Sequence, residues 1–161
     1  MRPKKATVSY ILRERDGLTE VLLYPRLNGS MAGFLIGPGG TREGDESSQE
    51  TAVRETTEET RLVFDLGDVE ECGALLFDIT QKHESWLVMM SRVRKWSGSP
   101  EPKLDSGLGN PEWHDITRLP EECFAPGDFL WIHQVLQGKP IAGSFQYGKN
   151  SGDLLSHNIS F

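Results

Sequence analysis

The stretch that decides the fold runs from Gly40 to Leu62 and reads GTREGDESSQETAVRETTEETRL. Nothing between residues 47 and 60 breaks a helix, because Glu, Gln, Ala and Arg are good helix formers. We therefore predict a helix over 47–60. At 100° per residue, one face of this helix should be buried although it is poor in large apolar side chains; it carries Ala52, Val53, Thr56, Thr57 and Thr60.

The opposite face of the predicted helix carries Thr51 and three glutamates, Glu55, Glu58 and Glu59. The glutamates stand at positions i, i+3 and i+4, so their side chains emerge together. Like charges at this spacing repel each other, and their clustering makes sense where a hard cation such as Mg²⁺ or Mn²⁺ lies among the carboxylates. The alternative is a solvated helix face, which is the usual meaning of an isolated ExxEE pattern.

Two neighbouring features suit a cation-binding cluster. Arg54 directly precedes the cluster and can hold a carboxylate by bidentate hydrogen bonds. Residues 37–40 read GPGG, and such a loop lets backbone carbonyls approach a metal, or amides approach a phosphate, without an intervening side chain. Carboxylates, a divalent metal and a glycine-rich loop together suit the attack of water on phosphorus.

Outward from this stretch, short apolar runs rich in β-branched and aromatic residues alternate with turns, which indicates strands. Asp16-Gly17 is typical of a hairpin turn between the first two. We predict strands over residues 6–12, 20–24, 72–80, 86–94, 113–117, 141–147 and 154–161, with a short apolar piece over 34–36.

A second helix is predicted over 128–137, with Asp128 as a candidate N-cap and Gly138 as a stop. The intervening stretch 97–111 is dominated by Gly, Pro, Ser and Asp, and a loop of this length is usually functional or mobile. Strands outnumber helices, so we predict the mixed α/β class. The length suits one domain over residues 1–161.

The composition excludes several classes of protein. Acidic residues outnumber basic ones 24 to 17, which argues against nucleic acid as a partner. No window is apolar enough for a membrane helix, and the first residues lack the pattern of a signal peptide. The two cysteines, Cys72 and Cys123, exclude a disulfide scaffold or a Cys-rich zinc site and suit a reducing compartment. We expect a cytoplasmic protein without a membrane partner.

The stretch 40–62 resembles the signature of the Nudix (MutT-like) hydrolases: Gly, five residues, Glu, seven residues, Arg-Glu, an apolar residue, one residue, Glu-Glu, one residue, Gly and an apolar residue. Arg61 replaces the last glycine, which suggests an altered exit from the helix, and Thr56 replaces an apolar residue. The resemblance implies an α/β/α sandwich around a mixed sheet. The fixed positions that match are Gly40, Glu46, Arg54, Glu55, Glu58 and Glu59, with Leu62 at the final apolar position.

The resemblance also implies the metal site. Glu55, Glu58 and Glu59 would bind Mg²⁺, with Mn²⁺ as the alternative. A backbone carbonyl of Gly39 or Gly40 would complete the metal shell, and both glycines would lie against the substrate. The three glutamates, together with Arg54, would also form the catalytic set.

Further roles follow from the same resemblance. Arg54 would orient a ligating carboxylate, and Glu46 would brace the junction of loop and helix. Arg26 is a candidate phosphate contact, with an ordinary surface arginine as the alternative. Asp105 lies in a loop from which some members supply a metal-binding or general-base carboxylate; the alternative is a solvated loop aspartate.

The C-terminal part is similar to enzymes that hydrolyse oxidised purine nucleoside triphosphates. The animal enzyme reads its base with an Asn and a Trp-Pro-Asp-Asp run, and the matching positions here are Ile36 and residues 125–128, which read APGD. Only Pro126 and Asp128 match, so specificity for oxidised guanine is not implied. Asp128 is either a base-reading carboxylate or a helix N-cap. We expect three tryptophans in the core, with stacking on a base as the alternative: Trp86, Trp113 and Trp131.

The activity implied is Mg²⁺-dependent cleavage of a phosphoanhydride, with a nucleoside triphosphate giving a monophosphate and pyrophosphate. The partner would be a small-molecule nucleotide or nucleoside diphosphate derivative, and the protein a monomer or homodimer. Hydrolysis of nucleoside diphosphate sugars or dinucleoside polyphosphates is an alternative, because loops outside the signature select the group attached to the diphosphate. A non-catalytic nucleotide-binding module is the alternative from another class.

Overall fold

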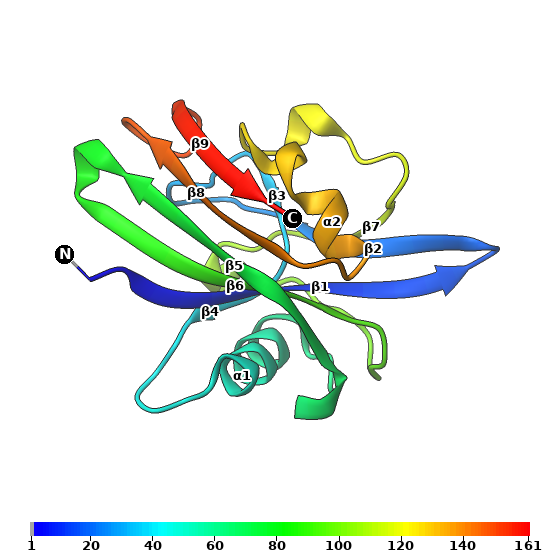
Figure 1. Ribbon diagram of the computed structural model, residues 1–161. Helices are drawn as coiled ribbons and strands as arrows, with labels where there is room; N and C mark the ends of the chain where they lie inside the picture. Colours follow the sequence, from blue (N-terminus) through cyan, green and yellow to red (C-terminus); the bar gives the residue numbers. More distant parts are fainter. Residues whose placement is uncertain (1) are drawn as a thin grey trace.

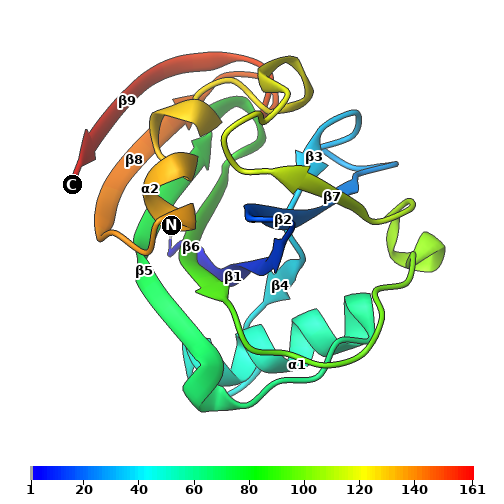
Figure 2. The same ribbon diagram turned by 90° about the vertical axis from the view of Figure 1, so that its right-hand side faces the viewer.

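A computed structural model describes residues 2–161 and shows a large mixed sheet with helix α1 on one side and helix α2 on the other (Figures 1 and 2). The α/β class and the sandwich are therefore confirmed. The helices are α1 (Ser48–Thr60) and α2 (Ile132–Leu136). The strands are β1 (Lys4–Arg15), β2 (Leu18–Pro25), β3 (Leu35–Ile36), β4 (Gly39–Thr41), β5 (Val69–Ile79), β6 (Glu84–Val93), β7 (Glu112–Asp115), β8 (Ile141–Tyr147) and β9 (Leu154–Ser160).

The strand order through the described residues is β3-β2-β1-β6-β5-β8-β9, with β4 paired to β1 and β7 paired to β2. The pairs β1–β6 and β5–β8 are parallel, and the others are antiparallel. All predicted strands are present; the strand predicted over 141–147 coincides with β8, and the others have shifted ends. The hairpin of β1 and β2 extends furthest beyond prediction, and its turn has positive φ at Asp16 (53°) and Gly17 (77°), as a tight hairpin turn requires.

Two apolar cores lie on opposite faces of the sheet, because side chains alternate between faces along each strand. One core packs under α2 and includes Tyr10, Met90 and Trp131. The other lies against α1 and includes Ile11 and Ala52. The stretch from Gly40 to Leu62 therefore belongs to the α1 layer, and the chain around Asp128 belongs to the α2 layer.

Helix α1 begins and ends as its sequence specifies. Ser47 caps the first turn and forms a reciprocal capping box with Glu50, which confirms the predicted start. The prediction was wrong for Thr51, which we placed with the glutamates on the exposed face. Thr51 is fully buried, and its hydroxyl donates to Glu46 Oε2 (2.9 Å). Contact with the loop before the helix therefore overrides the helical periodicity at this position.

The second predicted helix was wrong at its start. Residues Asp128–Leu130 form a 3₁₀ turn, and α2 begins only at Ile132. Asp128 makes no side-chain cap, so its interpretation as an N-cap is also wrong. Trp131 interrupts the helix with φ −137° because its indole packs into the core, where 3% of it is exposed. Tertiary packing here outweighs local helix propensity.

Arg61 ends α1 in the left-handed conformation, with φ 70° and ψ 5°. This explains why the family signature has glycine at the position, since a Cβ is strained there. We expect Arg61→Gly to raise the free energy of unfolding by about 1 kcal/mol. The ion pair lost with Glu101 is exposed and long (3.7 Å), so its contribution is small. Urea unfolding checks this, and an Arg61→Gly protein less stable than the parent would contradict it.

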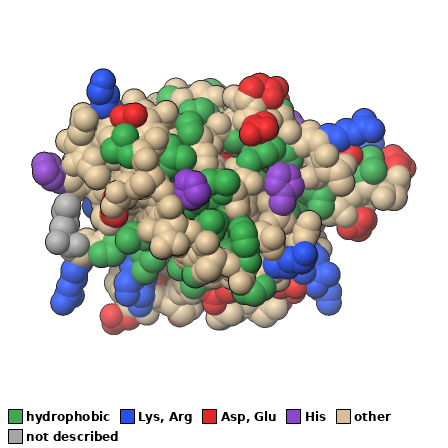
Figure 3. All heavy atoms as spheres, turned by 45° about the horizontal axis from the view of Figure 1, so that its top comes forward, with side chains coloured by type: hydrophobic (Ala, Val, Ile, Leu, Met, Phe, Trp, Pro, Cys, Tyr) green, Lys and Arg blue, Asp and Glu red, His purple; other side chains and the backbone are tan. Residues whose placement is uncertain are grey.

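None of the helices in residues 2–161 is long and apolar enough to cross a membrane. On the face shown in Figure 3, the basic side chains of the described residues lie singly or in small groups around the rim. Hydrophobic side chains occupy the middle of this face, interspersed with polar atoms.

Candidate active site

Strand β4 brings the glycines against the glutamates of α1. The Gly39 amide donates to Glu59 Oε1 (2.8 Å). A side chain at Gly40 would overlap the carboxyl group of Glu55, and one at Gly39 would overlap the backbone of Thr7 on β1. Both positions therefore need glycine for close approach rather than for an unusual φ. This close approach of the Gly40 backbone to the Glu55 carboxyl group is the local feature that fits a cation site beside Glu55.

Arg54 joins the loop before α1 to the glutamate cluster. Its Nε and Nη2 donate to the two oxygens of Glu46 (2.5 and 3.0 Å) in a bidentate pair. Its Nη1 donates to Glu55 Oε1 (2.9 Å), and Nη2 also donates to the Thr41 carbonyl (3.0 Å). These bonds lower the pKa of Glu46 to about 2 and raise that of the Arg54 guanidinium. The predicted neighbours are thus brought together around one guanidinium.

The three glutamates differ in their surroundings. Glu58 is the most exposed, with 58% of its side chain accessible, and lies 3.5 Å from Arg54 Nη1. Burial raises the pKa of Glu59 to about 7, and the charges of Glu55 and Glu58 add to this, while the Gly39 amide and Arg26 act against it. Negative charge at Glu59 is therefore poorly compensated by the protein. A divalent cation would supply the missing positive charge.

The carboxylates do not form a finished cage. Among residues 2–161, no three His, Cys, Asp or Glu side chains converge closely enough to hold a metal ion as they stand. Glu55 faces Arg54 and Glu59 faces the Gly39 amide, so the groups would have to turn toward a shared cation. Helix α1 places all three within little more than one turn of each other, on neighbouring positions of its surface. Glu55, Glu58, Glu59 and a carbonyl of Gly39 or Gly40 could then hold a metal.

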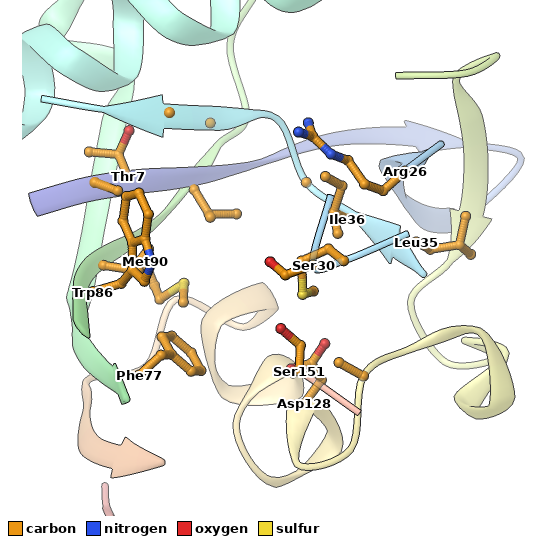
Figure 4. Close-up of a pocket in the computed structure, with 18 of the residues that line it drawn as sticks. Thr7, Arg26, Ser30, Leu35, Ile36, Phe77, Trp86, Met90, Asp128 and Ser151 are labelled. Atoms are coloured by element: carbon orange, nitrogen blue, oxygen red, sulfur yellow. The ribbon is translucent and has the colours of Figure 1, made fainter. Parts of the chain in front are cut away.

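A cavity of about 360 Å³ opens beside these groups (Figure 4). Glu59 of α1 and Gly39 and Gly40 of β4 line it. Asp128 also lines it, and in Figure 4 its side chain lies away from β4 and from Arg26. Its walls are mostly apolar and include Phe77, Trp86, Met90 and Ile36. The size and lining suit an organic ligand with one flat apolar part and one anionic part.

Asp128 is a buried carboxyl group in the lining of this cavity. Its side chain is on the α2 side, and only 8% of the residue is exposed. Burial raises the pKa of Asp128 to about 7, although a backbone hydrogen bond at Ala125 lowers it in part. Its charge also helps to raise the pKa values of Tyr10 and Tyr147, beside it. At neutral pH this carboxyl group can therefore both donate and accept a hydrogen bond.

Trp131 is a polar contributor that the sequence prediction missed. It is in the core, as predicted, but it also lines the cavity, and its Nε1–H has no partner anywhere in residues 2–161. A buried indole N–H normally finds a partner. The only sequence signal for a role of Trp131 in the cavity was its position three residues after Asp128. The helix predicted over 128–137 did not reveal it.

The remaining predicted residues fall in different places. Arg26 lines the cavity, and its Nε donates to the Asn28 carbonyl (3.1 Å). Asp105 is exposed, contacts Lys103 (3.4 Å) and is not brought to the cavity. In that loop it is Glu101 that meets α1, through its amide and the Thr60 carbonyl (3.1 Å).

The predicted tryptophans also separate. Trp86 lines the cavity, half-buried, with the Lys4 ammonium 5.0 Å from its ring centre. Trp113 stacks on Trp96 (5.6 Å between centroids) and is not among the residues that line the cavity. Of the three tryptophans that we considered for stacking, Trp86 and Trp131 therefore line the cavity and Trp113 does not.

Comparison with known proteins places the chain among relatives of known fold. A family model described as NUDIX domain matches residues 3–135. An oxidized purine nucleoside triphosphate hydrolase from Danio rerio is 30% identical over 127 residues, covering 79% of this chain and 78% of that protein. A MutT protein structure from Bacillus halodurans matches with a TM-score of 0.79 at 23% identity, covering 98% of this chain and 97% of the other. The NUDIX domain of Shewanella oneidensis NrtR, solved with ADP ribose, matches with a TM-score of 0.68 at 16% identity, covering 85% and 88%.

The family match spans most of the chain and includes the whole stretch from Gly40 to Leu62. The structure gathers the residues of that stretch around Arg54 and beside one cavity. Fold, stretch and relatives agree. The chain belongs to the NUDIX domain family and is a Nudix hydrolase.

Proposed function

We propose that the protein hydrolyses a nucleoside triphosphate to a nucleoside monophosphate and pyrophosphate. The observation that carries the proposal is the lining of one cavity, which includes Glu59 of the glutamate cluster, the glycines of β4 and a single buried carboxyl group, Asp128, in otherwise mostly apolar walls. The phosphates of the nucleotide would lie beside Glu59 and the glycines, and its base would lie beside Asp128. The relative named oxidized purine nucleoside triphosphate hydrolase supports this choice.

We propose that Glu55, Glu58 and Glu59 hold Mg²⁺ together with a backbone carbonyl of Gly39 or Gly40. Mg²⁺ prefers carboxylate and carbonyl oxygens, and Mn²⁺ accepts the same ligands. When bound, the metal offsets charge that develops on the phosphoanhydride. The supporting observations are the poorly compensated charge at Glu59 and the close approach of the Glu55 carboxyl group to the backbone of Gly40.

The protein's own residues then divide the remaining work. Arg54 holds Glu55 in place while Glu46 fixes Arg54 from the other side. Arg26, at the edge of the cavity, neutralises phosphate charge. A water oxygen attacks the α- or β-phosphorus, the bond from that phosphorus to the oxygen bridging the two breaks, and a glutamate of the cluster takes the proton of that water.

Asp128 is proposed to read the base, with the Trp131 indole N–H as a second donor. Both are buried beside an apolar wall that includes Trp86, which offers a flat surface for stacking. Ile36, Ala125 and Gly127 supply no side-chain hydrogen bonds here. We therefore propose a purine or modified purine nucleotide as substrate, without selectivity for oxidised guanine in particular.

The state of Asp128 can be tested through stability. Its pKa of about 7 in the folded protein exceeds the ordinary 3.8, so the folded state binds the extra proton and stability falls as pH rises from about 4 to above 7. We expect Asp128→Asn to raise the free energy of unfolding at pH 8, by about 4 kcal/mol at most, and to change it little near pH 4. Urea unfolding across this pH range measures the effect, with exposed Asp45→Asn as the control. Parallel pH profiles for the parent and Asp128→Asn would contradict the assignment.

A second candidate activity is hydrolysis of a nucleoside diphosphate derivative such as a nucleotide sugar. The observation that favours it is the structural likeness to a NUDIX domain solved with ADP ribose. Its phosphoanhydride would occupy the same glutamate side of the cavity. The group beyond the diphosphate would then decide between the two activities.

A substrate panel with Mg²⁺ tests the proposal. It contains normal and oxidised nucleoside triphosphates, nucleotide sugars and dinucleoside polyphosphates, and phosphate is measured with and without added pyrophosphatase. Phosphate that depends on pyrophosphatase and arises only from triphosphates would support the proposal and identify the base. Turnover only of nucleotide sugars or dinucleoside polyphosphates, followed by their nucleotide products, would replace it with the second candidate.

We also propose a cytoplasmic protein that acts as a monomer or homodimer. The two cysteines, one buried and one half-buried, are both unpaired within the described residues, as suits a reducing compartment.

A further inference from the structure

Four hydroxyl groups are buried without a hydrogen-bond partner among residues 2–161. They belong to Thr7 (2% exposed) and to Ser9, Thr56 and Ser91, which are fully buried. Burying a hydroxyl group that bonds to nothing costs free energy, and such groups are uncommon in folded proteins. Four of them in one small protein therefore call for a partner.

Three of these hydroxyls lie on the face of the sheet that α1 covers. Ile11 and Val93 pack in the core against α1, and alternate residues of a strand share a face. Ser9 precedes Ile11 by two positions and Ser91 precedes Val93 by two, so both face α1. These two serines are direct neighbours in the parallel pair of β1 and β6.

Thr7 belongs to the same layer. It precedes Ser9 by two positions on β1 and shares its face. In Figure 4 its hydroxyl points away from Met90 and Phe77, toward β4 and α1. The row of hydroxyls on the sheet therefore runs from Thr7 through Ser9 to Ser91.

Thr56 supplies the fourth hydroxyl from the helix. It lies one turn after Ala52, which packs in the same core, so its side chain points at the sheet. Thr60, one turn further on, is satisfied within the helix, because its hydroxyl donates to the Thr56 carbonyl (2.7 Å) and accepts from the Leu62 amide (3.1 Å). Thr56 has no such bond, and it stands where the family signature has an apolar residue.

We propose that these four hydroxyls bind at least one internal water molecule beneath α1. A buried water typically makes about three hydrogen bonds, and hydroxyls that can both donate and accept suit it. All four groups are neutral, which fits water better than an ion. The helix that carries Glu55, Glu58 and Glu59 therefore rests on a hydrated layer, and the water joins α1 to β1 and β6.

The sign of a melting-temperature shift tests this site without metal or substrate. Thr56→Val keeps the shape of the side chain but removes the hydroxyl. If water is bound, the variant deprives it of a partner, and we expect Tm to fall by about 2–4 °C. If the layer is dry, the variant removes an unpaired polar group and Tm rises, which would overturn the proposal.

Two further measurements complete the test. Thr57→Val, on the same helix but only half-buried, corrects for the change in helix propensity. A high-resolution crystal structure of the parent should show an ordered water within hydrogen-bond distance of at least two of the four hydroxyls, and Thr56→Val should lose or displace it. Hydroxyls that bond only to the backbone, with no water between them, would overturn the proposal.

Discussion

Replacing Glu58 with Gln is expected to lower kcat by about 100-fold or more and to leave Tm nearly unchanged. The Glu58 carboxylate is the most exposed of the three, and its ion pair with Arg54 is long, at 3.5 Å. The folded state therefore loses little stability when this charge is removed. A metal-bound transition state loses much more, since an amide cannot replace a charged ligand of a divalent cation. Steady-state kinetics at saturating Mg²⁺, paired with a thermal melt, measure both effects.

Glu50→Gln is the matched control for this change. It removes one negative charge from the same helix, and Gln can keep the capping box that Glu50 makes with Ser47. Its kcat should stay within about twofold of the parent. Full activity in the Glu58→Gln protein would exclude Glu58 as a metal ligand.

Arg54→Met is expected to reduce both stability and activity. The guanidinium bonds Glu46 in a bidentate pair, and also Glu55 and the Thr41 carbonyl, with 22% of its side chain exposed. Its removal leaves the partly buried carboxylates of Glu46 and Glu55 without the cation that both of them contact. We expect the free energy of unfolding to fall by about 2–4 kcal/mol, and kcat/KM to fall because Glu55 is no longer held.

The matched control is Arg94→Met. Arg94 also forms a bidentate pair, with Glu70, but 60% of its side chain is exposed, so its loss should lower the free energy of unfolding much less than the loss of Arg54 does. Equal losses in the two variants would show that Arg54 has no special structural role.

The pH dependence gives Arg54 a second readout. Arg54 lowers the pKa of Glu46 from 4.5 to about 2, so the pair stabilises the folded state above pH 4.5 and loses this effect as pH falls toward 2. Arg54→Met should therefore show a weaker loss of stability between pH 4.5 and 2 than the parent. An unchanged acid slope would contradict the pairing.

The sequence predicted α1 well because its signals are local. Helix formers, the cap at Ser47 and the spacing of the glutamates all act within a few residues. The glycine-rich loop was expected to let the backbone approach a metal or a phosphate, and the structure shows that Gly40 lies directly against the Glu55 carboxyl group. The helical periodicity, however, did not indicate that Thr51 would turn toward Glu46, because Glu46 lies in the loop before the helix.

The part of the cavity around Asp128 was less predictable. The pattern after residue 127 favours a continuous helix from Asp128, and the core packing of Trp131 breaks it. That break places the carboxyl of Asp128 and the indole N–H of Trp131 beside the same cavity. Similarly, the hydroxyls of Ser9, Ser91 and Thr56 come together only when β1 pairs with β6 and α1 covers both. Long-range packing decides these features, and a single sequence does not encode it in a local pattern.

The products formed from one nucleoside triphosphate in the presence of Mg²⁺ test the central claim most directly. Ion-exchange chromatography of the reaction should show nucleoside monophosphate and pyrophosphate in equal amounts, with both absent in EDTA and strongly reduced in Glu58→Gln. Nucleoside diphosphate and orthophosphate as products, or undiminished turnover in EDTA, would contradict it.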